Sequence, residues 1–146
     1  MPRRTLKSSL DACHSIKALL IKYGIDSALS GGIYIATRPV GSTQEDCVIN
    51  TTYADADQVQ TVLINVNFHV ENLKSQPSDN PTATDNTQPN RERLNQLGEL
   101  AAAVLDSQES TDYSLRLRNP GKIEGYQNDW YYNIVVEYTH LRKDLE

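Results

Sequence analysis

Three histidines, His14, His69 and His140, are the first residues in this chain that could carry chemistry. They lie far apart in the sequence, and none belongs to an HExxH or Cys-x-x-Cys motif. A metal site from His69 and His140 would require two strand ends to converge, so we interpret both as ordinary surface histidines. Cys13 and His14 are adjacent on a predicted helix and therefore diverge, which does not favour a catalytic pair. The sequence predicts no catalytic residue, no metal site and no cofactor.

Two further motifs resemble ligand sites but are better explained as turns. Ser30-Gly31-Gly32 looks like a phosphate-binding loop, yet a strand follows it in place of a helix N-terminus, and no Walker lysine is present. Asp55 and Asp57 could bind a cation, but no further EF-hand ligands follow them. We expect both segments to be solvated turns.

The charge of the chain argues against a dedicated nucleic-acid binder. The formal net charge is -5 and the isoelectric point is about 5.2, whereas a dedicated nucleic-acid binder normally has a basic surplus. Arg91 with Arg93, and Arg116 with Arg118, form two basic pairs. Solvated helix and sheet edges explain them best, and contact with a partner or with DNA phosphate is the alternative.

The composition is that of a small globular protein. A chain of 146 residues fits one domain, and no apolar run is long enough to span a bilayer. The N-terminus is basic, but the residues after it are amphipathic, so we expect no signal-peptide core. Synthesis in a cytoplasm without export by that route is therefore expected. Cys13 and Cys47 are too few for a disulfide scaffold, and we expect both to be buried thiols.

The most regular element is the stretch of residues 58–72, which alternates almost perfectly. Side chains on a strand point to opposite faces in turn, so this stretch has one continuous apolar face and one face that changes from apolar to polar. The apolar face consists of Val62, Ile64, Val66, Phe68 and Val70. Because the strand is unusually long, we expect it to extend beyond its own domain.

The elements around this strand follow from periodicity and turn residues. Helical spacing predicts helices over residues 9–23 and 90–107. Short strands are predicted over 33–37 and 45–52, and their short connections favour an antiparallel meander with the long strand. The segment 74–90 is polar and proline-rich, which is typical of a long loop or mobile arm.

The C-terminal third is predicted to contain two strands. Residues 111–118 form the first, Asn119-Pro120-Gly121 makes a turn, and residues 129–140 form the second. The predicted fold is therefore one α+β domain spanning residues 1–146. It has a mainly antiparallel sheet of about five strands, with two helices packed on one face.

The succession of local motifs resembles the small neck and tail-completion proteins of tailed bacteriophages, and tail terminators above all. The resemblance extends from about Leu6 to Tyr138. It rests on Ser30-Gly31-Gly32-Ile33-Tyr34, Arg38-Pro39, Ser42, the run from Glu45 to Asn50, the long strand ending in Glu71-Asn72, and Arg93-Leu94.

The resemblance implies a virion component that forms a homo-oligomeric ring, usually sixfold, between head connector and tail tube. It implies other neck and tail proteins as partners, and neither catalysis nor a cofactor. DNA is expected only as cargo passing through the lumen, and an acidic subunit suits such a lumen because like charges repel phosphate. Two other classes stay open, a small cytoplasmic α+β enzyme or ligand-binding domain, and an adaptor that binds at a sheet edge.

For a ring, we expect part of the long strand and nearby charged or aromatic residues to form the subunit interface. The segment Asn65–Asn72 is predicted to extend beyond its neighbouring strands, which leaves an edge that another subunit must cover. A proline at Asn67 would then yield a folded monomer. The predicted interface residues are Asn65, Asn67, His69, Glu71, Tyr131, Arg116 and Arg118.

Overall fold

The computed structural model describes residues 6–74, 87–106 and 108–142. Its elements follow the order that the sequence predicts, which is a helix, three strands, a second helix and two strands. They are α1 (Ser9–Lys22), the 3-10 turn η1 (Asp26–Ala28), β1 (Ile33–Ile35), β2 (Asp46–Ala54), β3 (Val59–His69), α2 (Arg91–Leu105), β4 (Ser114–Tyr126) and β5 (Asp129–Leu141).

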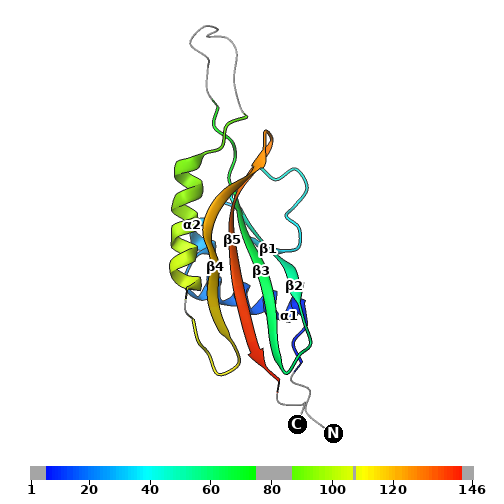
Figure 1. Ribbon diagram of the computed structural model, residues 1–146. Coiled ribbons are helices and arrows are strands. Elements are labelled where there is room, and N and C mark those ends of the chain that lie inside the picture. Colours follow the sequence, from blue (N-terminus) through cyan, green and yellow to red (C-terminus); the bar gives the residue numbers. More distant parts are fainter. Residues whose placement is uncertain (1–5, 75–86, 107, 143–146) are drawn as a thin grey trace.

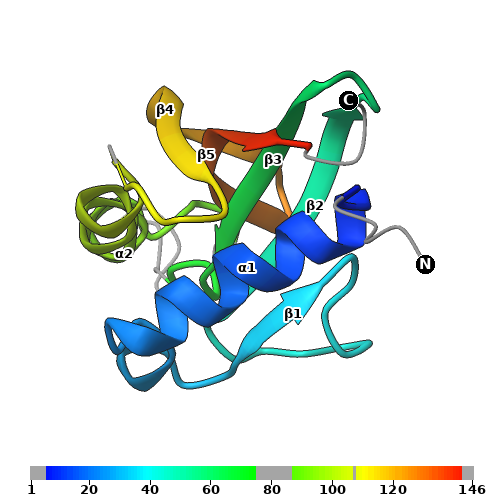
Figure 2. The same cartoon turned by 90° about the horizontal axis from the view of Figure 1, so that it is seen from below.

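The five strands form one sheet in the order β1-β2-β3-β5-β4. All neighbours are antiparallel except β1 and β2, which are parallel. Both helices lie on the same side of this sheet (Figures 1 and 2). The α+β fold class predicted from the sequence is therefore confirmed.

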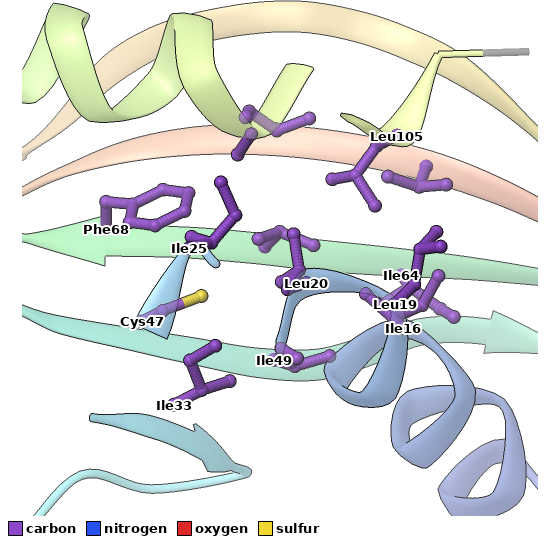
Figure 3. Packing of buried hydrophobic residues seen from close by; sticks show 14 of the residues in the cluster. Ile16, Leu19, Leu20, Ile25, Ile33, Cys47, Ile49, Ile64, Phe68 and Leu105 are labelled. Atoms are coloured by element: carbon purple, nitrogen blue, oxygen red, sulfur yellow. The ribbon is translucent and has the colours of Figure 1, made fainter. Parts of the chain in front are cut away.

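The core lies between the sheet and the helices, and it uses the predicted face of the long strand. Val62, Ile64, Val66 and Phe68 are fully buried. The helices contribute further buried side chains, and Figure 3 shows several of them packed over β2 and β3. These helix residues are Ala12, Cys13, Ile16, Leu19, Leu20, Leu94, Leu97, Ala101 and Leu105.

The predicted meander is wrong for its first pair of strands. Ile33 lies opposite Cys47 and Ile35 opposite Ile49, in parallel register. The connection does not form a hairpin, because Ala36 adopts a positive φ of 75° and the chain returns beside the start of β1. There the Gly31 N–H donates to the Glu45 carbonyl at 2.9 Å. Because β1 has only three residues, the 36–45 connection can return to the start of β1 without a crossover helix.

The predicted unpaired edge is also wrong, because β3 is paired on both sides from Val62 to His69. It pairs with β2 from Val62 to His69 and with β5 from Val59 to His69. Periodicity reports which face a strand buries, but it carries no signal for the length of its neighbours. A proline at Asn67 would therefore disrupt a central ladder, so it would not separate assembly from folding.

The segment Asn119-Pro120-Gly121 is not the predicted turn but an irregularity within β4, which continues to Tyr126. Gly121 has a φ of 124°, and a Cβ there would lie 2.1 Å from the Tyr132 ring. A Cβ at Gly98 on α2 would meet the same ring at 2.1 Å. The two glycines make room for one buried tyrosine, and the bulge bends β4 around it.

The polar segment predicted at 74–90 falls mostly on residues 75–86, which lie outside the described residues. Its two flanks are held together. The Leu73 N–H donates to the Gln88 carbonyl at 3.0 Å, and the Trp130 indole N–H donates to the Thr87 carbonyl at 2.8 Å. Asn90 then caps α2 by accepting from the Arg93 N–H at 3.2 Å.

Candidate interaction surface

No described helix covers the sheet face opposite α1 and α2, and we call it the open face. The β1–β2 connection covers only its end at Asp46 and His69, which are buried. The side chains of the open face alternate with those of the core, so they occupy the second parity of each strand. Figure 2 shows both helices on the other side of the sheet. A hollow of about 440 Å³ on this face is lined from β2, β3, β4 and β5 by side chains such as Asn65, Lys122 and Tyr131.

Asparagine side chains connect four strands across this hollow. The Asn133 amide donates to Asn65 at 3.1 Å and to Asn67 at 2.7 Å, and the Asn65 amide donates to Asn50 at 3.0 Å. Asn119 donates to Asn133 at 3.3 Å. The register explains the network, because Asn50 lies opposite Asn65 and Asn67 lies opposite Asn133. The network satisfies the buried Asn133 amide and holds this part of the open face rigid.

An apolar area lies at one end of the open face. Tyr53, Val59 and Leu141 are 49%, 54% and 52% exposed, respectively. Val59 is directly opposite Leu141, and Tyr53 is opposite Leu63, so the side chains form two cross-strand pairs four positions apart along β3. Exposed apolar pairs of this kind are the candidate contact area of the open face.

A histidine–carboxylate pair lies at the other end. His69 Nδ1 is 2.8 Å from Asp129 Oδ1, and the His69 ring lies 5.3 Å from the Tyr131 ring. The His69 side chain is only 11% exposed. Burial lowers the pKa of His69 below its ordinary value, and the Asp129 carboxylate opposes this effect only in part.

This pKa direction predicts a pH dependence of stability. Because the folded-state pKa is lowered, stability is present above the unfolded-state pKa of about 6.5 and is lost as the pH falls toward the folded-state value. We expect the free energy of unfolding to fall more between about pH 7.5 and pH 5.5 in wild type than in His69→Gln. Urea unfolding at both pH values measures this. His14→Gln is the control, because His14 is exposed, and an equal slope in all three proteins would contradict the assignment.

Two arginines form the border of the open face along β4. Arg116 Nη2 lies 2.7 Å from Glu137 Oε2, and Arg118 Nη1 lies 3.4 Å from Glu137 Oε1. The arginine side chains are 69% and 50% exposed, whereas Glu137 is only 17% exposed. Two guanidinium groups thus share one largely covered carboxylate, which leaves surplus positive charge toward solvent.

The structure places most of the predicted interface residues on one surface. Asn65, Asn67, His69 and Tyr131 lie on the open face, with Arg116 and Arg118 at its border. Glu71 is exposed beyond the end of β3, where it pairs with Lys74 at 3.5 Å. Sequence reasoning missed Asn50, Asn119 and Asn133. These asparagines could be found in the sequence by their positions on the same face of paired strands. That search requires the pairing of the strands to be known.

The remaining candidate residues do not form a reactive cluster. Gln60 pairs with His140 and Tyr131 pairs with His69, so the two histidines lie at opposite ends of β3. Both are largely buried, so the expectation of surface histidines is wrong for them. Cys13 and Cys47 are buried as predicted, and burial raises the pKa of each thiol. Within the described ranges, no three His, Cys, Asp or Glu side chains are grouped to hold a metal ion.

A buried carboxylate explains several residues that carry the phage resemblance. Asp46 is fully buried, and its Oδ2 accepts from Arg38 Nε at 2.9 Å and from the Ser42 hydroxyl at 2.6 Å. Its Oδ1 accepts from the Gly32 N–H at 3.2 Å. These contacts hold the β1–β2 connection against the sheet. Arg38, Ser42 and Asp46 therefore have a structural role in the fold.

A second ion pair attaches α2 to the same region. Arg93 Nε lies 2.6 Å from Glu45 Oε2, and Arg93 Nη2 donates to the Ala28 carbonyl at 2.7 Å. The adjacent guanidinium lowers the pKa of Glu45, chiefly through this hydrogen bond. The Arg93–Glu45 pair therefore fixes the start of the second helix beside the start of β2.

Comparison with protein families and with curated sequences gave no match. No protein-family model matches the chain, and no curated protein matches it in sequence. Within the part of the chain that the structure describes, none of the helices combines the length and apolar character needed to cross a membrane.

Proposed function

We propose that this chain is a structural protein of a tailed-phage virion, a tail-terminator or tail-completion subunit of the neck. In this role it forms a homo-oligomeric ring between the head connector and the tail tube. The observation that carries the proposal is the open face. Both helices cover one side of the sheet, while the other side presents a hollow, a rigid amide network and exposed apolar side chains.

Such a surface suits permanent contact with a second protein. An antiparallel sheet can leave one face to solvent, but that face is then usually polar throughout. Here Tyr53, Val59 and Leu141 are each about half exposed at one end of it. Contact with another subunit would remove this apolar area from water, which is the main favourable term in most protein association.

The sequence resemblance and the charge supply the particular assignment. The motif succession is similar to tail terminators, which implies a sixfold ring with other neck and tail proteins as partners. The formal net charge of -5 suits a subunit that surrounds DNA as cargo without binding it. In this proposal the subunit is made in the host cytoplasm and functions in the virion.

An enzyme is the second candidate, and the His69–Asp129 pair is the observation that favours it. Arg38, Ser42 and Asp129 line a polar hollow of about 190 Å³ beside this pair. A hydrolase would need a nucleophile activated by the histidine. The Ser42 hydroxyl instead donates to Asp46 at 2.6 Å, which favours a structural role. A sheet-edge adaptor is disfavoured on β4, because Pro120 interrupts that edge.

A gene deletion in the phage that encodes the chain tests the proposal. We expect cells carrying the deletion to release heads and tails that are not joined, and a plasmid copy to restore infectious particles. Electron microscopy and plaque counts measure this. Infectious particles at the normal yield without the chain would contradict a neck function.

A further inference from the structure

We infer that subunits contact one another head to tail, with the basic margin of the open face of one copy against the outer surface of α2 in the next. The inference rests on the proposed ring function and specifies its interface. The basic margin is defined as Arg116, Arg118 and Lys122 on β4. The acidic helix surface is defined as Glu92 and Glu99 on α2.

The basic margin carries more positive charge than its local partners neutralise. Arg116 and Arg118 share the single carboxylate of Glu137. Lys122 pairs with Glu124 at 2.6 Å. Three cations therefore face two carboxylates, and the cations are the more exposed members, with side chains 50% to 69% exposed against 17% and 35%.

The outer surface of α2 has a surplus of the opposite sign, with the exposed carboxylates of Glu92 and Glu99 against the exposed guanidinium of Arg91. Glu92 and Glu99 are seven positions apart, so they lie on the same side of the helix. Both are exposed, and Asn95 donates to Glu99 at 3.0 Å between them. Arg93, the nearest inward-facing cation, is already engaged by Glu45. Leu100 is 46% exposed at the border of this surface and offers an apolar contact beside the charges.

The two surfaces lie on opposite sides of the same layer. The helix α2 packs on β4 and β5 from the covered side (Figure 2). Arg116 lies on the open side by register, because it is opposite Glu137, which is opposite Leu63 of the open face. A twofold contact would need both surfaces of each copy within one interface, because the basic margin of each copy would then meet the acidic helix surface of the other. A head-to-tail contact places acidic against basic at every interface, and repetition of one such contact closes a ring when the rotation permits.

Charge reversal with mixing tests this arrangement. The first variant is Arg116→Glu with Arg118→Glu, and the second is Glu92→Arg with Glu99→Arg. Each alone opposes like charges at every interface, so we expect at least a tenfold loss of assembly at about 0.1 M salt. An equimolar mixture can alternate the two variants with opposite charges at every contact, so we expect it to assemble.

Sedimentation velocity and plasmid complementation of the deleted phage are the two readouts. Lys17→Glu with Lys22→Glu on α1 is the matched control, because it changes the net charge as much as the first variant does. If the first variant unfolds, Arg116→Gln with Arg118→Gln replaces it, and a smaller loss is expected. Variants that assemble alone, or a mixture that restores nothing while wild type does, would overturn the head-to-tail contact. Wild type that neither assembles nor complements would overturn the ring proposal itself.

Discussion

Phe68→Ala is expected to lower the free energy of unfolding by about 3–5 kcal/mol. The Phe68 side chain is fully buried on β3, between the sheet neighbours Cys47 and Tyr132. Its truncation removes apolar contacts and leaves a cavity that the surrounding close-packed side chains can fill only in part. Urea unfolding followed by circular dichroism measures the change.

Val59→Ala is the matched control on the same strand. Val59 is 54% exposed on the open face, so its truncation is expected to change stability by about 0.5 kcal/mol or less. A loss below about 1 kcal/mol for Phe68→Ala would show that the buried side of β3 has been assigned wrongly.

Asp46→Ala is expected to cost about 3–5 kcal/mol, because it removes one member of a buried ion pair. The Asp46 side chain is 1% exposed, and the Arg38 guanidinium beside it is 24% exposed. The substitution leaves Arg38, the Ser42 hydroxyl and the Gly32 N–H without their shared acceptor, and unmade buried hydrogen bonds carry a desolvation cost. Thermal and urea unfolding measure the loss.

A double-mutant cycle with Arg38→Ala separates this ion pair from the other contacts. If the two side chains act as a unit, the double variant is expected to lose less than the sum of the two single losses. Asp57→Ala is the control, because Asp57 is exposed in the β2–β3 turn. Equal small losses for Asp46→Ala and Asp57→Ala would contradict a structural role for the buried carboxylate.

Periodicity within a segment was enough to predict most of the elements. The stripe from Val62 to Val70 is buried as predicted, because a strand with one buried face permits only one parity. The helices begin close to the expected residues, and Ser8 caps α1 with Asp11 in a capping box. These features are local, so the sequence of each segment determines them.

The errors concern contacts between segments. The parallel pairing of β1 depends on where the 36–45 connection returns, and the extent of β3 pairing depends on β2 and β5. The irregularity at Asn119-Pro120-Gly121 leaves room for the Tyr132 ring, and a turn motif considered alone cannot show this. Only part of the candidate surface was predicted, because it too depends on contacts between segments. Asn65 and Asn67 were found on their own strand, but Asn133 joined them only through the sheet register.

The most direct test of a ring-forming subunit is the mass of its assembled species. Native mass spectrometry of the purified protein and of the neck isolated from particles measures it. We expect one closed oligomer that contains six copies of the 16.4 kDa chain. A monomer at every protein concentration, and in the native particle as well, would contradict this expectation.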